Sequence, residues 1–152
     1  MHIALTIFCA LGCLGIPLCS TALAASSKST TAITLIDQAG HPVTLSGPAK
    51  RVLSLSPSNT ELMYYLGEED RLVGRSKHCD YPPDALQVPS VGSLFPPDYE
   101  RILNTKPDLV LMSSGTDLVR KTLQGHGLKV LVIQPKTIAA ITDSLALLAR
   151  AL

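Results

Sequence analysis

The sequence has no tryptophan, two phenylalanines and four tyrosines among its 152 residues, so aromatic side chains contribute little to its core. Its charge is nearly balanced, with 13 basic and 12 acidic residues, and no basic run occurs. This argues against nucleic-acid binding, which needs a concentrated positive surface. The apolar residues are mostly Leu, Val, Ile and Ala, which is typical of a parallel sheet covered by helices. The length corresponds to about one domain.

Motifs for phosphate handling or metal-dependent catalysis are also missing. No glycine-rich phosphate loop occurs, and the four histidines form no pair with a metal-ligand spacing such as H-x-x-x-H. His78, Cys79 and Asp80 carry suitable ligand atoms, but three consecutive residues do not readily converge on one ion. We therefore expect a binding protein rather than an enzyme, with no catalytic residue, no metal site and no cofactor.

Charged residues are absent from the first 27 positions. Residues 3–19 are almost wholly apolar, and Ala22-Leu23-Ala24 follows as a small-x-small cleavage site. We predict a signal peptide over residues 1–24, a flexible leader over residues 25–32, and export to the periplasm. A transmembrane anchor is the alternative, but two glycines and a proline interrupt the apolar run, which is shorter than the roughly 20 residues that span a bilayer.

Cysteine is scarce outside that segment. Cys9, Cys13 and Cys19 lie within the apolar run, and Leu18 before Cys19 argues against a lipid-anchored cysteine there. Only Cys79 remains after cleavage, so no internal disulfide framework is expected. We interpret Cys79 as a partly buried small hydrophobic residue rather than a nucleophile.

Residues 51–67, RVLSLSPSNTELMYYLG, predict a strand that leads directly into a helix. Val52, Leu53 and Leu55 make a short apolar run of strand type. Ser56 offers a capping oxygen, and Pro57 suits the first helical position, where its missing N–H costs nothing. Gly67 follows the expected helix over residues 57–66 as a plausible C′ residue.

This junction marks the place of a binding site, because open α/β sheets bind ligands at the carboxyl ends of their strands. Backbone N–H groups point outward there, so Ser56, Ser58 and Asn59 are candidates to hold an acidic or amide group of a ligand. The alternative is plain helix capping, in which Ser58 and Glu61 form a shifted capping box.

The remaining elements alternate between strand and helix. A β-hairpin is expected over residues 33–46, with its turn centred on Gly40. Alternation of this kind predicts an α/β fold with a Rossmann-like parallel sheet flanked by helices. Further strands are predicted at residues 72–74, 88–91, 108–113 and 128–134, and helices over 98–103, from Thr116 or Asp117 to 124, and from 137 onward.

The last segment predicts one apolar helix face without a stop signal. Its apolar residues recur at spacings of three and four, and no Gly, Asn or Pro follows. We expect the chain to be a fragment that ends inside a helix. The stripe comprises Ile138, Ile141, Leu145, Leu148 and Leu152.

Residues 51–112 carry RVLSLSPSNTEL, CDYPPDA, VGS and YERILNTKPDLVLMS in that order. With the hairpin and the last segment, they resemble periplasmic substrate-binding proteins of ABC importers for cobalamin, haem and ferric siderophores, and are most similar to the cobalamin-binding members. The resemblance implies two α/β lobes joined by a long helix, with the ligand between them. Residues 33–136 would then be the N-terminal lobe and residues 137–152 the start of the interlobe helix, with the second lobe absent.

The resemblance also implies site residues. Tyr81, fixed between Asp80 and two prolines, corresponds to a tyrosine that faces the cleft, and such a side chain stacks well on a bulky apolar ligand. Leu94 and Phe95 occupy a loop that presents an aromatic residue in cobalamin-binding relatives. Glu100 matches a glutamate that pairs with permease arginines. Ser113 and Ser114 follow a strand where a relative carries an aromatic residue, and these departures leave haem or a siderophore open as the ligand.

Two other classes of protein remain open from the residues alone. One is an enzyme or regulatory domain in which the turn at residues 56–59 holds phosphate. The other is an interaction protein that uses the lobe surface without a ligand. The favoured interpretation is capture of a cobalamin-like solute and its delivery to an ABC importer permease, with contact to the membrane only through that permease.

Overall fold

The computed structural model describes residues 31–113 and 117–152. Its first element is the predicted hairpin, in which β1 (Ile33–Ile36) pairs antiparallel with β2 (Pro42–Leu45). The turn closes around the buried Asp37, whose Oδ1 accepts hydrogen bonds from the backbone N–H groups of Ala39 at 2.9 Å and His41 at 2.7 Å. Gly40 supplies the positive φ of 84° that the turn requires.

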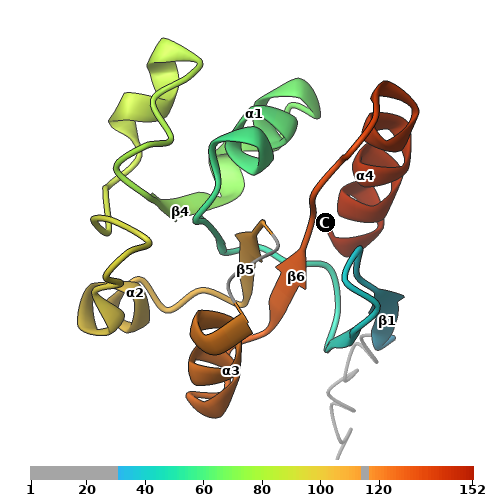
Figure 1. The fold of residues 1–152 in the computed structure, drawn as a ribbon, viewed down its shortest axis with the longest axis horizontal. Coiled ribbons are helices and arrows are strands. Elements are labelled where there is room, and N and C mark those ends of the chain that lie inside the picture. Colours follow the sequence, from blue (N-terminus) through green and yellow to red (C-terminus); the bar gives the residue numbers. More distant parts are fainter. Residues whose placement is uncertain (1–30, 114–116) are drawn as a thin grey trace, which may run out of the picture.

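The main sheet is parallel, as predicted, and has four strands in the order β4-β3-β5-β6 (Figure 1). From β3 the chain moves outward to β4, and from β5 it moves outward in the other direction to β6. The direction of winding therefore reverses between β3 and β5, where α/β sheets open a crevice at their carboxyl edge. The strands are β3 (Val52–Ser54), β4 (Leu72–Arg75), β5 (Leu109–Met112) and β6 (Val130–Val132).

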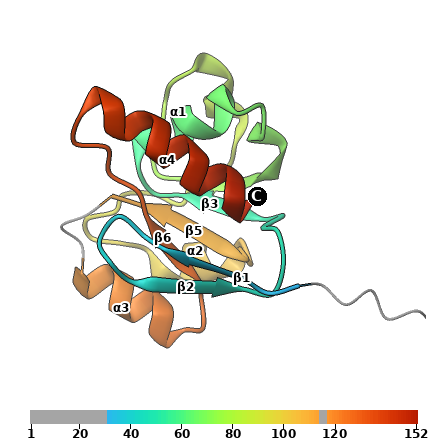
Figure 2. The ribbon, with the colours of Figure 1, turned by 90° about the vertical axis from the view of Figure 1, so that its right-hand side faces the viewer.

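Helices cover both faces of this sheet (Figures 1 and 2). α1 (Pro57–Tyr65) and α4 (Ile138–Ala151) pack on one face with the hairpin, and α2 (Tyr99–Asn104) and α3 (Asp117–Gly125) pack on the other. Successive strand residues point to opposite faces, so the structure has two apolar cores. The first core includes Val52, Leu62, Met63, Leu109, Leu111, Leu131 and Leu148, and the second core includes Leu53, Ile102, Val110, Met112, Val119 and Leu123.

The prediction of a strand over residues 88–91 is wrong. Ser90 forms only an isolated bridge with Arg75, and the preceding residues Pro83–Gln87 form a 3-10 helix that the sequence pattern did not indicate. Pro89 has no N–H to donate to the neighbouring strand, so the pairing stays limited to this bridge.

The ends of α1 confirm one prediction and correct another. Gly67 has a φ of 70°, and the N–H groups of Gly67 and Glu68 donate to the carbonyls of Tyr64 and Met63 at 3.1 and 3.0 Å, which is a Schellman motif. Ser56 is the N-cap residue, but its side chain makes no capping hydrogen bond. Its Oγ lies 3.1 Å from Ser58 Oγ instead, so the expected cap and capping box do not form.

The other predicted helices are present. Asp98 caps α2 by accepting a hydrogen bond from the N–H of Arg101 at 3.0 Å, and Thr137 caps α4 by accepting one from Ala140 at 3.1 Å. Asp117 is the first residue of α3, and Thr116, the other suggested cap, lies outside the described residues.

The apolar stripe predicted on α4 is only half buried. Leu148 is fully buried, whereas Ile138 is 88% exposed and Ile141 is 40% exposed. The buried end is held by the carbonyl of Ala151, which accepts a hydrogen bond from the Ala49 N–H at 2.8 Å. α4 therefore packs on its own lobe through its C-terminal half, and its role as an interlobe helix stays a prediction.

Arg71 stabilises the same region, where the segment before β3 meets the end of α4. Its Nη1 donates to the carbonyls of Ala49 at 2.6 Å and Leu152 at 2.8 Å, and its Nε contacts the carboxylate of Glu68. The segment before β3 and the end of α4 are thus joined through one guanidinium.

In the part of the chain that the structure describes, no helix has both the length and the apolar character needed to cross a membrane. The predicted signal peptide over residues 1–24 and positions 25–30 of the leader lie outside that part.

Candidate functional site

A network of hydroxyl groups fixes the turn between β3 and α1. The Thr60 Oγ1 donates to Ser54 Oγ at 2.8 Å, and Ser54 Oγ donates to the carbonyl of Ser56 at 3.1 Å. Cys79 lies against this network, with its Sγ 3.8 Å from the carbonyl of Ser54 and 3.2 Å from Ser76 Oγ. All these groups are buried, so the turn has one defined shape.

The three polar residues predicted at this turn have different exposures. Ser58 is exposed on the first turn of α1, whereas Ser56 is buried beneath it and joined to it through the hydroxyl contact. Asn59 is completely buried, and neither polar atom of its side chain has a hydrogen-bond partner among the described residues. Ser58 is therefore the residue of this group that a ligand at the surface reaches directly.

A mostly apolar hollow of about 720 Å³ lies between α1, α4 and the segment around Tyr81, and we call it the α1–α4 groove. Tyr81 is 64% exposed and lines the same groove as Ser58, so the structure brings together these two predicted ligand residues. The full lining is Ser58, Glu61, Leu62, Tyr64, Tyr65, Tyr81, Pro82, Pro135, Ile138, Ile141, Thr142 and Leu145.

Tyr64, which lines the groove, has a raised pKa. Burial raises the pKa of the Tyr64 phenol, and the negative charges of Asp84 and Glu69 raise it further, against the opposing effect of Arg75. Tyr64 therefore stays neutral and keeps its O–H as a hydrogen-bond donor up to strongly alkaline pH.

The other predicted ligand residues lie away from this groove. Leu94 is half-buried and packs against the second core, while Phe95 is 62% exposed. Ser113 follows β5 at the carboxyl edge of the sheet, and Ser114 lies outside the described residues. Their contacts with a ligand stay predictions.

Glu100 is exposed on the first turn of α2, on the opposite face of the sheet from the groove. Its neighbour Arg101 pairs with Asp98 at 3.1 Å, and no ion pair involves Glu100 within residues 31–113 and 117–152. The carboxylate is thus accessible to a partner protein.

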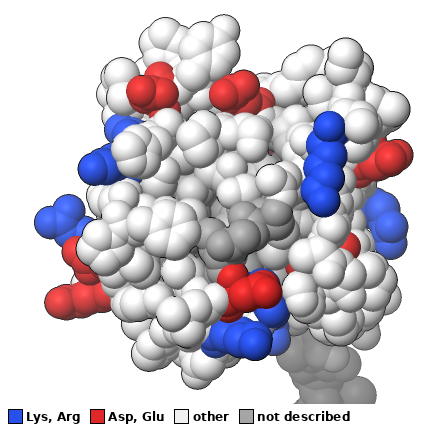
Figure 3. Space-filling view, viewed as in Figure 1, with Lys and Arg blue, Asp and Glu red and all other residues white. Residues whose placement is uncertain are grey.

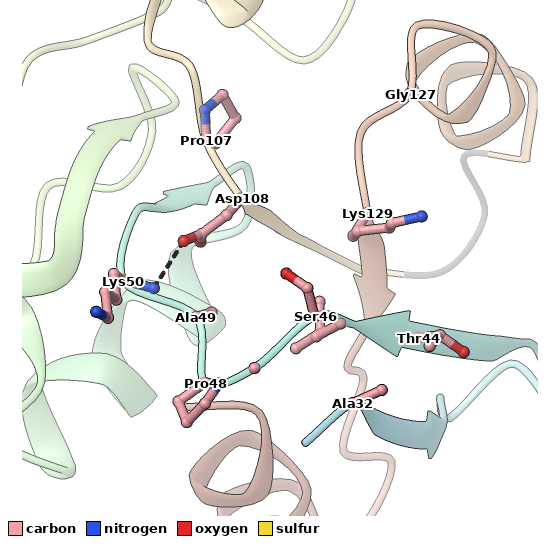
Figure 4. A pocket seen from close by; sticks show the side chains of 12 residues that line it. Ala32, Thr44, Ser46, Pro48, Ala49, Lys50, Pro107, Asp108, Gly127 and Lys129 are labelled. Carbon is pink, nitrogen blue, oxygen red and sulfur yellow. Dashed lines mark hydrogen bonds between the residues drawn. The ribbon is translucent and has the colours of Figure 1, made fainter. Parts of the chain in front are cut away.

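A second hollow, of about 780 Å³, lies at the opposite edge of the sheet, beside the amino ends of β3 and β5 (Figure 4). Its central carboxylate, Asp108, already accepts hydrogen bonds from the backbone N–H groups of Lys50 at 2.9 Å and Arg51 at 3.0 Å. The side chains of Lys50 and Lys129 extend away from each other in Figure 4. Because its polar groups do not converge, we do not regard this hollow as the candidate site.

Cys79 is fully buried in the core rather than partly buried as predicted, and its neighbours His78 and Asp80 are exposed. Among the described residues, no three His, Cys, Asp or Glu side chains are grouped in a way that would hold a metal ion. On the face shown in Figure 3, basic side chains lie apart from one another or beside acidic ones.

Several residues of the groove were not predicted from the sequence as parts of a site. Ile138 and Ile141 were predicted only as part of an apolar helix face, and no role was predicted for Tyr64 and Tyr65, yet all four line the groove. The adjacent residues Tyr64 and Tyr65 could have indicated an exposed aromatic surface on this helix. Of two adjacent aromatic residues on a helix, one is turned away from the core.

These observations define the class of protein. The chain forms a Rossmann-like α/β lobe whose open carboxyl edge carries an exposed tyrosine, a serine and an apolar groove, the arrangement expected of a lobe that binds small molecules. The chain belongs to the periplasmic binding protein family, whose sequence profile matches residues 52–152.

Individual relatives agree with this assignment. The chain is 39% identical over 101 residues to the vitamin B12-binding protein of Photorhabdus laumondii, a match that covers 65% of this chain and 37% of the relative. The crystal structure of the periplasmic vitamin B12 binding protein BtuF of Vibrio cholerae matches with a TM-score of 0.62 and 34% identity, covering 68% of this chain and 42% of that one.

The heme binding protein HmuT has a similar fold, with a TM-score of 0.67 at 22% identity, covering 93% of this chain and 46% of HmuT. In each of these comparisons the matched region spans less than half of the other protein.

Proposed function

We propose that this chain is the N-terminal lobe of a solute-binding protein of an ABC importer and that its solute is a cobalamin-like corrinoid. The observation that carries the proposal is the position of Tyr81 and Ser58 on one mostly apolar groove at the carboxyl edge of the sheet. A corrinoid presents a broad apolar ring system with amide groups at its rim, which suits stacking on Tyr81 and hydrogen bonding to Ser58. The vitamin B12-binding relatives support this ligand class.

Haem is the second candidate ligand, supported by the fold similarity to a heme binding protein. A ferric siderophore is the third. These ligands all have large planar or apolar surfaces, so Tyr81 serves each of them in the same way, and direct comparison of the three is needed to separate them.

The ligand would be enclosed only partly, because the chain matches less than half of its relatives. Binding a ligand costs translational and rotational freedom whether or not the site is complete, whereas the compensating burial here comes from one surface. We therefore expect dissociation constants in about the millimolar range for this chain.

Titration of cobinamide, haemin and a ferric catecholate siderophore into the purified protein, followed by NMR chemical shifts, tests the proposal. We expect cobinamide to shift signals of residues around Tyr81 and Ser58 and to saturate at millimolar concentrations. Shifts confined to the Asp108 hollow, or no shifts with any of the three, would contradict it. Larger shifts with haemin than with cobinamide would reassign the ligand.

We further propose that the protein is exported by the segment over residues 1–24, captures its ligand in the periplasm and delivers it to a membrane permease. The mechanism is capture and release rather than catalysis. The apolar N-terminal sequence and the family assignment support export. The exposed Glu100, which forms no ion pair with any residue that the structure describes, supports docking.

Replacing Glu100 by Lys should lower the rate of association with the importer permease by about tenfold at low salt, because exposed charges steer the approach of the two proteins. Biolayer interferometry against permease-containing proteoliposomes measures this rate, and the effect should shrink as salt screens the charges. Asp70→Lys, at an exposed carboxylate in the 3-10 turn Glu69–Arg71 before β4, makes the same change in charge and should leave the rate unaltered. Equal effects of both variants would remove Glu100 from the docking surface.

A further inference from the structure

The α1–α4 groove collects apolar side chains that are not covered. Tyr65 is 78% exposed and Ile138 is 88% exposed, and Tyr81 and Ile141 lie beside them in the same groove. These four account for half of the eight large hydrophobic residues that are exposed in the described part of the chain. Apolar residues gathered in this way mark an interaction surface, whereas single exposed ones are ordinary.

The two flanks of the groove carry opposite charges. Glu61 lines the α1 flank, and Lys136 adjoins the lining residue Pro135 at the start of the α4 flank. Both side chains are exposed, and neither takes part in an ion pair with any other residue that the structure describes.

Both charges lie near the same end of the groove. α1 follows the carboxyl end of β3 and α4 follows the carboxyl end of β6, so the two helices start at the same edge of the parallel sheet. Glu61 is on the first turns of α1, and Lys136 comes just before the first residue of α4. Figures 1 and 2 both show the two helices side by side on one face.

We propose that this groove is the interface of a symmetric dimer, with a second copy of this chain as its partner. A two-fold axis running along the groove places the α1 flank of one copy against the α4 flank of the other. Glu61 of each copy then faces Lys136 of its partner, and the charge pair forms twice. The exposed Tyr65 and Ile138 of each copy enter the groove of the other, as an isologous contact requires.

The charge pattern favours this partner over an unrelated apolar one. A groove with an acidic flank and a basic flank is complementary to its own two-fold image, and such complementarity fixes the register of an interface. The inference shares Tyr81 and Ser58 with the candidate ligand site, but it concerns the protein without ligand. A negative result in the dimer test would therefore leave the proposed ligand binding untouched, and the reverse also holds.

Sedimentation velocity of the purified, ligand-free protein over a range of concentrations tests the proposal. We expect a dimer that dissociates on dilution, and a monomer at every concentration for Ile138→Asp. Leu118→Asp is the matched control, because Leu118 is 79% exposed on α3, on the other face of the sheet, and should leave the dimer unchanged. Thermal melting of both variants verifies that each is folded.

Charge reversal provides a test that does not depend on the apolar contact. Glu61→Lys and Lys136→Glu should each weaken the dimer by about tenfold, since each places like charges opposite one another twice. The double variant restores the opposite charges and should recover the dimer. A monomeric parent protein, equal effects of Ile138→Asp and Leu118→Asp, or a double variant as weak as the single ones would each overturn the proposal.

Discussion

Replacing Asp37 by Ala should lower the free energy of unfolding by about 3 kcal/mol, because buried backbone donors lose their acceptors at a cost of roughly 1–3 kcal/mol each. The carboxylate holds the hairpin turn through the N–H groups of Ala39 and His41 and reaches the N–H of Val132 at 3.4 Å. It thereby joins β1 and β2 to the edge strand of the main sheet. Urea unfolding followed by circular dichroism measures the loss.

Two further variants give this prediction its controls. Asp37→Asn keeps one acceptor oxygen and should lose less stability than the Ala variant. Asp70→Ala removes an exposed carboxylate and should change the free energy of unfolding by less than about 0.5 kcal/mol. A loss of under 1 kcal/mol for Asp37→Ala would show that the hairpin is held mainly by its apolar contacts.

Replacing Tyr81 by Ala should lower the saturation with cobinamide from one half to below about one tenth at the concentration where the parent protein is half saturated. The side chain is the exposed aromatic group on the loop that borders the groove, and truncation of such an anchor costs about 2 kcal/mol or more, which is at least tenfold in affinity. NMR chemical shift titration is suited to such weak binding.

The conservative variant separates the contributions of the ring and the hydroxyl. Tyr81→Phe keeps the stacking surface and should retain most of the affinity, whereas Leu118→Ala, on α3, should retain all of it. If Tyr81→Ala binds as the parent does, the ligand contacts a different part of the carboxyl edge.

The sequence was sufficient to predict the parallel sheet, because each strand is a short apolar run between turn residues. It was insufficient where backbone hydrogen bonding decides the outcome. Residues 88–91 have strand-like composition, but Pro89 cannot donate and only one bridge forms. Ser56 has the chemistry of a cap, yet a nearby hydroxyl competes for it.

Parts of the candidate site could be predicted only where a single short segment of sequence indicates a site residue. The SPSN turn and the Tyr81-Pro82 segment are each visible in the sequence, but their common position on one groove depends on how α1 packs beside the loop. Periodicity placed Ile138 on the same helix face as Leu148, but it does not show that the neighbouring helix fails to cover that end of the face.

The polar network beneath Ser58 is built largely from neutral hydroxyl groups and backbone carbonyls. None of the serine or threonine hydroxyls gains or loses a proton as the surroundings become moderately acidic or alkaline, and dissolved ions have no net charge there to shield. The turn beneath Ser58 should consequently hold its geometry when the surrounding solution changes in acidity or salt concentration.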